Sequence, residues 1–537
     1  MVSADAGPIT PCRRTYADCT AHRRPHAAAE SCVVHPSRPS TSMEAVQLTP
    51  PQRLSGLPTW GPLGVAAAAL AWLVLRTSAH GIGLDSDGAQ YLAAAASLRE
   101  GDGWLGVDGA PYTLWPPLYP LCIALLELVG MSASAAVRVL HMAALATSVL
   151  LAGSISWRLT GSRAIPSLAA AAVAWTLMPV AEQAWSECAF AVWTLLAFSC
   201  LLRWSVSRAR TDFAAFAAAC ALAILQRYVG ILVLGWIAIG VAWIERENGW
   251  SRALRRAGVL TVAALAPTSI WLARNAMLGA ADTSRRGAPS DDWMYDLRGM
   301  LSQLVPTSAP LEPAAIAAAL LLAAGTVLAL RSHRGPAVRC LALFPLAFGA
   351  GLVVLRHLVE FDPIDERLMS PARALAALVA TCALGWLWTS VPARVFALVA
   401  ALPIGMRALE QCRTLPARLE HARSEGLGLY DSPRWRDSES VRVLRKRLPE
   451  GAGYSNEPHA LFLLAGVRTR ALPPRAAGIG RLYERWSSEP ATPRWILWFH
   501  FNVRAELPHP QAEQAVRLVR EELFADAELV RVEPAQD

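Results

Sequence analysis

Eleven apolar stretches are the feature that most constrains how this 537-residue chain can fold. A helix needs about 20 apolar residues to cross roughly 30 Å of hydrocarbon, because each residue adds about 1.5 Å. Only 17% of the residues are charged, 54% are hydrophobic and the mean hydropathy is +0.32, so lipid must be the main solvent of the chain. We predict a mainly α-helical, polytopic membrane protein with about eleven spans, at residues 61–79, 134–157, 164–180, 187–204, 213–226, 228–244, 257–274, 313–330, 338–358, 370–388 and 392–408.

The arginines of the short loops predict how these spans are oriented. They recur in every second loop, and such positively charged loops face the cytoplasm. The same pattern accounts for the net charge of +8 without a nucleic-acid partner. An odd number of spans then places the C-terminus outside the cytoplasm. The arginines concerned are Arg158, Arg163, Arg203, Arg208, Arg210, Arg246, Arg252, Arg255, Arg256, Arg331, Arg334, Arg339 and Arg394.

Polar residues on the opposite side predict where the protein acts. They cluster at the ends of spans and in two long external loops, whereas a transport path would need polar residues in the middle of the spans. We therefore predict an enzyme with its site on the outer face, and keep a transporter or lipid flippase as the alternative. The residues on this side are Asp85, Asp87, Glu182, Glu187, Arg227, Arg274, Asn275, Arg285, Asp362, Asp365 and Arg367.

Composition divides the chain into three parts. Residues 1–57 are polar and lack periodicity, so we predict a disordered tail rather than a signal peptide, with Met43 as another candidate start. Residues 58–412 form the membrane domain, in which the proline-broken stretch 116–130 is expected to be a re-entrant or surface helix. Residues 413–537 are predicted to fold as a small external α/β domain, with helices at 441–448, 458–464 and 511–523 and strands at 451–455, 495–499 and 529–532.

Two carboxylates in the first external loop, Asp85 and Asp87, are the leading candidates for chemistry. Asp87 precedes a run compatible with a helix that ends at Gly101, so one interpretation is that Asp87 merely caps this helix. The other is that the pair, held at the membrane surface near Pro116 and Pro117, activates an acceptor hydroxyl or binds a divalent metal such as Mg²⁺ or Mn²⁺.

An ordered set of short motifs resembles the GT-C glycosyltransferases, in particular the bacterial lipid A aminoarabinose transferases and protein mannosyltransferases. Each motif is weak alone, but their order and shared side cover roughly residues 61–470. The resemblance implies that a sugar moves from a polyprenyl-phosphate carrier to a lipid, glycan or protein acceptor at the outer face of the inner membrane. It also implies that the anomeric centre is inverted. The motifs are Asp87-Gly-Ala-Gln-Tyr91, Gly101-Asp-Gly-Trp104, Pro116-Pro-Leu-Tyr119, Ser186-Glu187, Arg227-Tyr-Val-Gly230, Trp271-Leu-Ala-Arg274-Asn275, Asp362-Pro-Ile-Asp365-Glu-Arg367 and Tyr454-Ser-Asn456.

The resemblance also implies roles for individual residues. Asp87 would be the base or a metal-bound carboxylate, supported by Asp85 and Glu187. Tyr91, Tyr119 and Asp365 would contact substrate, and the carrier phosphate would be held by Arg227, Arg274, Arg285 and Arg367, because guanidinium groups stay charged and donate paired hydrogen bonds.

The sequence departs from the pattern of the aminoarabinose transferases at two positions, and several of the implied roles have a structural alternative. Gly88 and Trp115 occupy positions where the aminoarabinose transferases have an acidic residue and a lysine. The second change removes a candidate phosphate contact and leaves the four arginines as its replacements. The arginine side chains could instead extend to the lipid headgroups, and Arg367 could form an ion pair with a neighbouring aspartate. Glu187 could simply begin a helix, and the tyrosines could belong to the aromatic belt at the membrane surface.

Overall fold

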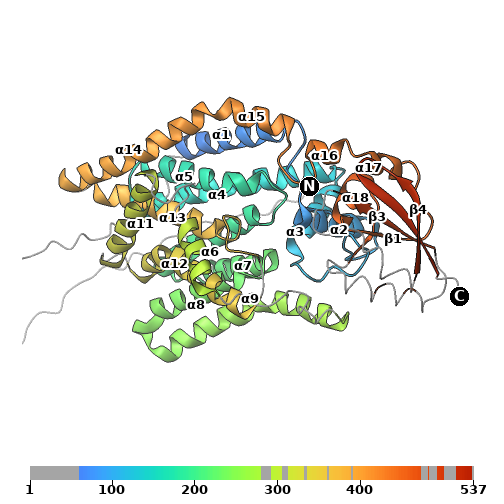
Figure 1. Ribbon diagram of the computed structural model, residues 1–537. Coiled ribbons are helices and arrows are strands. Elements are labelled where there is room, and N and C mark those ends of the chain that lie inside the picture. The colour runs from blue at the N-terminus through green and yellow to red at the C-terminus, as the bar shows by residue number, and fades with distance from the viewer. Residues whose placement is uncertain are drawn as a thin grey trace, which may run out of the picture. The chain divides into compact units, whose positions relative to one another are not determined.

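The structure is a computed structural model that describes residues 60–279, 292–304, 313–331, 335–359, 362–388, 391–472, 482, 486, 493–500 and 516–534 (Figure 1). The predicted disordered tail, residues 1–57, lies outside the described residues. Residues 53–537 form one compact unit, so the predicted domain boundary at residue 413 stays a prediction.

Each of the eleven predicted spans coincides with a helix. Six of the described helices, α4, α6, α9, α11, α12 and α13, are long and apolar enough to cross a membrane, and the total number of crossings stays a prediction. The helices are α1 (Trp60–Arg76), α4 (Ala133–Thr160), α5 (Ile165–Ala181), α6 (Glu187–Ser207), α7 (Arg210–Gln226), α8 (Gly230–Glu245), α9 (Trp250–Met277), α11 (Pro313–Arg331), α12 (Pro336–Leu358), α13 (Ser370–Leu387) and α14 (Val391–Arg413).

Small and aromatic residues pack these helices together. α4 lies against α5 and α6, and α5 lies against α13 (Figure 1). Gly153 faces Pro62 so closely that a Cβ there would come within 2.9 Å of the proline ring, and small residues commonly allow such close approach of helices in lipid. Phe198 and Phe344 meet edge to face at 4.9 Å and join α6 to α12. Packing of this kind must hold the helices together, because lipid exerts little hydrophobic force between them.

Charged residues balance one another at the end of the bundle that we predict to be cytoplasmic. Glu245, at the end of α8, is buried and pairs with Arg208 at 2.6 Å and Arg256 at 2.8 Å. Arg203 likewise pairs with buried Asp212. The short helix η1 (Arg246–Asn248) connects α8 to α9 at this end.

The shorter helices α2 (Ser86–Glu100), α3 (Leu118–Leu128), α10 (Trp293–Leu304), α15 (Leu415–Ser424) and α16 (Pro433–Arg436) connect the spans and the C-terminal region. α3 follows Pro117 directly and confirms a short helix within the stretch 116–130. Figure 1 shows α2 and α3 at the end of the bundle that adjoins the sheet.

The C-terminal region is an α/β fold with the strand order β2-β1-β3-β5-β4. β1 runs parallel to β2 and β3, whereas β5 is antiparallel to β3 and β4. One face of the sheet packs against α17 and α18 through a core that includes Trp435, Leu461 and Phe499. The elements are α17 (Glu439–Leu444), β1 (Ala452–Ser455), α18 (Pro458–Ala465), β2 (Arg470–Ala471), β3 (Arg494–Phe499), β4 (Val516–Leu523) and β5 (Ala527–Pro534).

The predicted helix at 511–523 is wrong where the structure describes it. Residues Val516–Leu523 form β4, which pairs antiparallel with β5 over nearly its whole length. Valine and leucine at 516, 518 and 519 suit a strand, and pairing with β5 outweighs the local helical preference. Residues 511–515 lie outside the described part of the chain.

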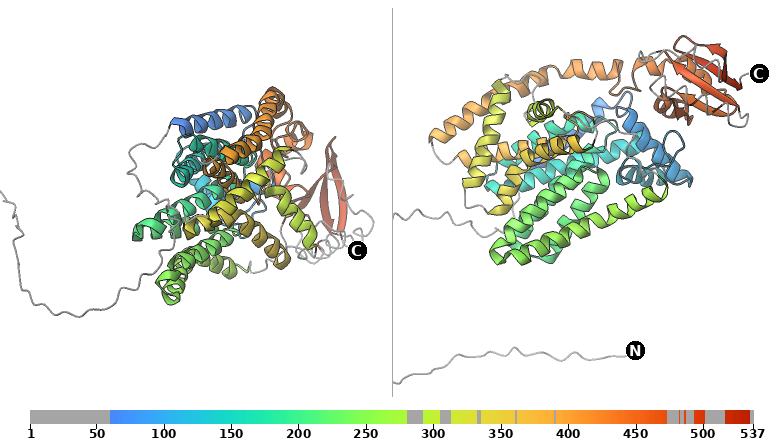
Figure 2. Two further views of the ribbon diagram at one scale, coloured as in Figure 1. Left: turned by 90° about the vertical axis from the view of Figure 1, so that its left-hand side faces the viewer. Right: turned by 60° about the horizontal axis from the view of Figure 1, so that its bottom comes forward.

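Direct contacts join the α/β region to the membrane helices. α18 packs on α2, and Phe462 and Leu463 contact the small core formed by Ala89, Ala93 and Val107. Figure 2 shows α14 and α15 running along the bundle to the α/β region. The C-terminal region therefore lies against the helix that carries Asp87.

Candidate active site

The segment that leads into α2 is held on both sides by backbone contacts. Gly83 donates to the Glu182 carbonyl at 2.9 Å and accepts from the Ala184 amide at 2.8 Å, which ties it to the loop between α5 and α6. On the other side, the Tyr430 amide donates to the Leu84 carbonyl at 3.1 Å. Three distant parts of the chain thus fix where α2 begins.

Asp85, not Asp87, caps α2. Its Oδ1 accepts a hydrogen bond from the Gly88 amide at 2.9 Å, and its Oδ2 accepts from the Trp185 indole. The interpretation that Asp87 is merely the helix cap is therefore wrong. The carboxylate of Asp87 is left for other partners, whereas both oxygens of Asp85 are engaged.

Asp87 is the first member of a carboxylate–arginine network, which we define as Asp87, Arg367, Glu187 and Arg227. The Asp87 Oδ2 accepts from Arg367 Nη1 at 2.8 Å, and Arg367 Nε lies 3.2 Å from Glu187 Oε1. Arg227 Nη1 contacts the same oxygen of Glu187. Glu187 is the first residue of α6 and its side chain is 1% exposed, so two cations compensate one buried carboxylate.

Breaks between helices position the two arginines. Arg227 has an extended backbone at the end of α7, where it separates α7 from α8. Arg367 lies in the turn that precedes α13, and its Nη2 donates to Asp362 Oδ2 at 2.8 Å. The Asp362 side chain is 70% exposed, whereas that of Arg367 is 11% exposed. The network therefore runs from solvent-exposed Asp362 to the buried start of α6.

The surroundings of Asp87 shift its acidity. Burial raises the pKa of Asp87 above its ordinary value of 3.8, while the Arg367 charge lowers it and the Asp85 charge raises it. For Arg367, burial lowers the pKa, but the carboxylates of Glu187 and Asp87 raise it more strongly, so the guanidinium stays charged. The result is a carboxylate more basic than usual beside a permanent cation.

Tyr91 and Tyr119 line the buried side of this region. The Tyr91 hydroxyl lies 3.3 Å from Ser186 Oγ, and burial raises the Tyr91 pKa well above its ordinary range, with Asp87 contributing. The Tyr119 hydroxyl lies 2.7 Å from His141 Nε2, and the two tyrosine rings meet edge to face at 4.9 Å. Both side chains are almost fully buried, so their substrate contact stays a prediction.

Arg274 belongs to an aromatic cluster, which we define as Trp104, Tyr112, Trp115 and Trp271. Its guanidinium donates to the Tyr112 carbonyl at 2.8 Å and lies over the Trp271 ring, 4.6 Å from the centroid. The Trp104 and Trp271 rings meet edge to face at 5.0 Å. The geometry thus separates Arg274, which contacts aromatic rings, from Arg227 and Arg367, which contact carboxylates.

Two further predicted residues have different outcomes. Asp365 accepts from the Leu368 amide at 2.9 Å and so stabilises the turn that carries Arg367; its substrate contact stays a prediction. Arg285 lies outside the described residues.

The sequence motifs did not single out Trp185, which is the structural link between the two aspartates. Its indole donates to Asp85, and its ring lies 5.2 Å below the guanidinium of Arg367. Ser186 is also more than a helix start, because its Oγ contacts both Tyr91 and Arg227. The one sequence feature that could have drawn attention to Trp185 is its position directly before the Ser186-Glu187 motif. Its contacts could not be predicted, because its partners lie far away in the sequence.

The residues around Asp87 do not fit a bound divalent cation as they are arranged. Within the described residues, no group of three histidine, cysteine or carboxylate side chains converges as metal ligands would. One oxygen of Asp87 accepts from Arg367, and Asp85 already accepts two hydrogen bonds. A cation next to Asp87 would also face the Arg367 charge.

Comparison with solved structures identifies the fold. ArnT from Cupriavidus metallidurans bound to undecaprenyl phosphate is similar with a TM-score of 0.56 and 16% sequence identity, over 88% of this chain and 98% of ArnT. The same ArnT in the apo state gives the same TM-score and identity, over 88% of this chain and 97% of ArnT. The chain has the ArnT fold. This confirms the GT-C fold class predicted from the motifs and, with the apolar helices, a multi-pass membrane protein.

The similarity to other known proteins is weaker. Arabinosyltransferase EmbB from Mycobacterium smegmatis has a TM-score of only 0.42 and 14% identity, over 78% of this chain and 44% of EmbB. No protein-family model matches the chain, and no curated protein matches its sequence.

Proposed function

We propose that this protein is a membrane glycosyltransferase that moves a sugar from a polyprenyl-phosphate donor to an acceptor hydroxyl, with Asp87 as the base. The observation that carries the proposal is the position of Asp87: its carboxylate is not used as a helix cap and is paired with Arg367 at the start of α2. The ArnT fold supports the donor class, because a structure with that fold binds undecaprenyl phosphate.

The chemical step follows from these groups. A lone pair of the acceptor oxygen attacks the anomeric carbon, and the bond between that carbon and the phosphate oxygen breaks with its electron pair remaining on the phosphate. The acceptor proton passes to the Asp87 carboxylate. A single displacement of this kind inverts the anomeric centre, and a carboxylate with a raised pKa is a better base than an ordinary aspartate.

Charge balance supports Arg274, rather than the carboxylate–arginine network, as the phosphate contact. Arg227 and Arg367 are already balanced by Asp87, Glu187 and Asp362. Among the three candidate arginines that the structure describes, Arg274 is the one that pairs with no carboxylate of a described residue; it contacts the Tyr112 carbonyl and Asn275. Its positive charge is thus available for the leaving phosphate, where negative charge develops in the transition state. The neighbouring aromatic cluster provides apolar surface for the carrier or sugar.

The proposed location follows the sequence prediction: the inner membrane, with the site on the extracytoplasmic side. A lipid, glycan or protein provides the acceptor hydroxyl. The transporter alternative would require polar residues along a path through the bilayer, whereas the carboxylate–arginine network lies at the ends of helices.

The decisive test is the variant Asp87→Asn. Purified wild type and variant are incubated with a polyprenyl-phosphate sugar and an envelope lipid extract as acceptor, and the free polyprenyl phosphate is quantified. We expect transfer to fall by about 10²- to 10⁴-fold, the usual contribution of a general base. Matched thermal unfolding and donor binding must show that the variant is folded.

Asp85→Asn is the matched control. Asparagine is also a good helix cap, so this variant keeps the start of α2 and should retain transfer within a few-fold. If Asp87→Asn transfers the sugar at nearly the wild-type rate, Asp87 is not the base. If neither protein releases polyprenyl phosphate while labelled donor crosses the membrane of a vesicle, the transporter alternative is correct.

A further inference from the structure

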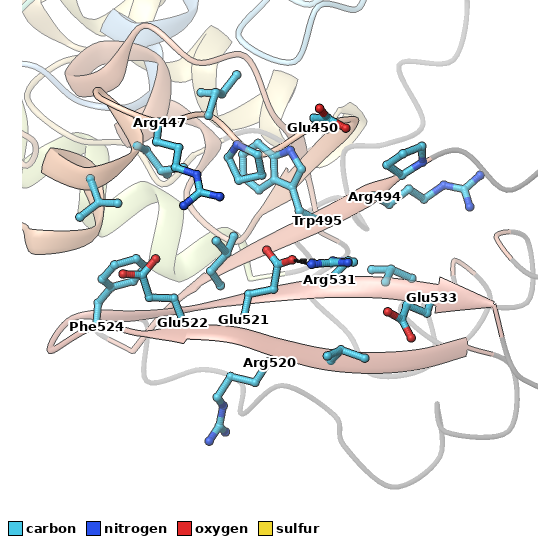
Figure 3. A pocket seen from close by; sticks show the side chains of 18 of the residues that line it. Arg447, Glu450, Arg494, Trp495, Arg520, Glu521, Glu522, Phe524, Arg531 and Glu533 are labelled. Carbon is cyan, nitrogen blue, oxygen red and sulfur yellow. Dashed lines mark hydrogen bonds and ion pairs between the residues drawn. The ribbon is translucent and has the colours of Figure 1, made fainter.

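α18 places the α/β region against α2 and against the loop 101–112 that follows α2. The groove of the α/β region, which has a volume of about 980 Å³, lies between the residues that follow α17 and the hairpin formed by β4 and β5 (Figure 3). No residue of α18 lines this groove. The side of α18 that carries Phe462 and Leu463 packs instead on α2 and the loop. This contact contains a histidine, His459, that the proposed mechanism does not use.

His459 on α18 faces Gln90 on α2. Nε2 of the imidazole lies 3.2 Å from Nε2 of the Gln90 amide. The amide oxygen of Gln90 accepts from the backbone amide of Val107 at 3.4 Å. Gly106 lies so close to that oxygen that a Cβ there would come within 2.8 Å of it. Gln90 therefore bridges α18 to the loop 101–112.

The Val107 amide determines which way the Gln90 side chain points. A backbone N–H can only donate, so the Gln90 oxygen faces Val107 and the NH₂ group faces His459. Because the NH₂ group also only donates, Nε2 of His459 must accept with its lone pair, and the imidazole proton resides on Nδ1. Protonation of His459 would place two donors opposite each other. Turning the Gln90 amide would not help, because its NH₂ group would then face the Val107 amide.

The surroundings of His459 favour this neutral form. Burial lowers the pKa of His459 below its ordinary value of 6.5, while the carboxylates of Asp108 and Asp85 oppose that change. Asp108 lies on the loop, and Asp85 caps α2. Arg468, which follows α18, adds a positive charge and donates to the Gly106 carbonyl at 3.4 Å. His459 is therefore neutral at neutral pH and becomes charged only in acid.

The loop 101–112 leads directly to Arg274. The Tyr112 amide donates to the Trp104 carbonyl at 2.8 Å and so closes the loop. The Tyr112 carbonyl accepts from Arg274 at 2.8 Å. The Trp104 ring meets the Trp271 ring at 5.0 Å, and the Arg274 guanidinium lies over that second ring. The loop thus supports Arg274 through a hydrogen bond and through an aromatic contact.

We propose that His459 is a positioning residue for the donor phosphate contact: it accepts the Gln90 hydrogen bond, and Gln90 thereby holds the loop 101–112 and Arg274 in place. Resting on the proposed glycosyltransferase function, in which Arg274 contacts the donor phosphate, this bridge makes the α/β region a support of the donor site. Loss of the hydrogen bond, by substitution or by protonation, loosens the loop and weakens donor binding.

Hydrogen exchange of the loop 101–112 tests the bridge without any substrate. The full-length protein in detergent is measured between about pH 7.5 and about pH 4.5, with a correction for the intrinsic pH dependence of exchange. We expect the wild-type loop to lose about tenfold in protection at the acid end, because a buried donor loses its partner. His459→Gln should keep its protection throughout, since a glutamine oxygen accepts at any pH.

Gln90→Glu provides the reciprocal test. A carboxylate suits the Val107 amide at any pH and pairs with a charged His459 in acid. The loop of this variant should therefore be protected at about pH 5 at least as well as at about pH 7.5, unlike that of the wild type. His421→Gln is the matched control, because His421 is an exposed histidine on α15, and it should follow the wild type. Thermal unfolding must show that each variant is folded.

Either of two results overturns the proposal. The first is a wild-type loop whose protection is the same at both ends of the pH range. The second is a loop in His459→Gln that loses protection in acid as the wild-type loop does, because the group that titrates would then not be His459.

A second readout separates this proposal from the proposed function. His459→Phe keeps a ring but cannot accept, so the KM for the donor should rise about tenfold at neutral pH while kcat stays nearly unchanged. His459→Gln should restore the KM to within a few-fold of the wild type. An unchanged KM in His459→Phe would overturn the link to Arg274. A wild type with a pH-dependent loop but no sugar transfer would contradict the glycosyltransferase function and the role in donor binding, but not the bridge itself.

Discussion

Asp85 and Asp87 lie two residues apart at the start of one helix and have different tasks. A capping side chain must bend back to an amide in the first turn, and Asp85 does so with Gly88. Asp87 lies inside that first turn, so its side chain extends sideways and meets Arg367. Helix geometry thus makes one carboxylate structural and leaves the other available for chemistry.

The pH dependence of transfer should report on Asp87. A base must be ionised, and burial raises the pKa of Asp87 above 3.8, so activity should fall as the pH decreases through that raised pKa. Arg367→Gln removes the charge that lowers this pKa, so the acidic limb of the profile should move to higher pH. The measurement is kcat against pH for both proteins. An acidic limb that stays at the same pH in Arg367→Gln would contradict the proposal that Asp87 is the base.

The raised pKa of Asp87 also makes the free energy of unfolding depend on pH. Because the folded-state pKa of Asp87 is raised, its contribution to stability is fully present below the unfolded value near 3.8 and is lost as the pH rises through the folded-state pKa. The ionised carboxylate therefore costs folding free energy at the pH at which we propose that it acts as a base.

Arg274→Gln should weaken the enzyme through the donor phosphate. The variant keeps a polar side chain but loses the charge, and a hydrogen bond to a charged group contributes about 1.5–3 kcal/mol. We expect kcat/KM for the donor to fall by about 10- to 100-fold, measured by steady-state transfer. Arg298, exposed on α10, offers the control Arg298→Gln, which should match wild type. An unchanged kcat/KM in Arg274→Gln would exclude it as the phosphate contact.

At the scale of elements, the start of α2 depends on a clamp formed by two loops. The loop before α6 holds Gly83, and the segment around Gly428 lies against Leu84 from the other side. Asp431 folds that segment by accepting from the amides of Leu427 and Gly428 at 2.7 and 2.6 Å. The C-terminal region is therefore part of the scaffold that positions Asp85 and Asp87.

Gly428→Ala should loosen this clamp. The new methyl group would overlap the backbone nitrogen and oxygen of Leu84, and such overpacking typically costs about 1–3 kcal/mol. We expect a lower melting temperature and a fall in kcat, because the start of α2 must move. Gly405→Ala on α14 meets no atom within 4 Å and should change neither. Wild-type behaviour of Gly428→Ala would show that the clamp is not needed.

At the scale of the whole molecule, the two ends of the helical bundle have different charge arrangements. At one end, arginines surround single buried carboxylates such as Glu245. At the other end lie the carboxylate–arginine network and the α/β region, joined through α15 and α18. This division agrees with the predicted cytoplasmic and external loops.

A topology assay tests this orientation. A phosphatase that is active only outside the cytoplasm should be active when fused after Asp537, and inactive when fused after Arg331 at the end of α11. The expected pattern follows from the positive-inside rule and the odd number of predicted spans. The reverse pattern would place the site at Asp87 in the cytoplasm and contradict the proposed location.

The sequence by itself determined the apolar helices of the membrane domain. Runs such as residues 134–157 and 338–358 are too apolar for water, and a backbone in lipid must satisfy its hydrogen bonds within each helix. The relevant information is local, so all eleven predicted stretches coincide with helices. The ordered motifs also identified Asp87, Glu187, Arg227 and Arg367, which the structure brings into one network.

Only the tertiary structure decided how these parts combine. Asp87 and Arg367 are 280 positions apart, and no local pattern states that they pair. The same holds for Asp85 as the cap, which depends on Trp185 as well as on Gly88, and for β4, which is a strand because β5 lies beside it. Helix formation in lipid is governed by neighbours in the chain, whereas ion pairs and strand pairing are governed by whichever distant segment the fold brings within reach.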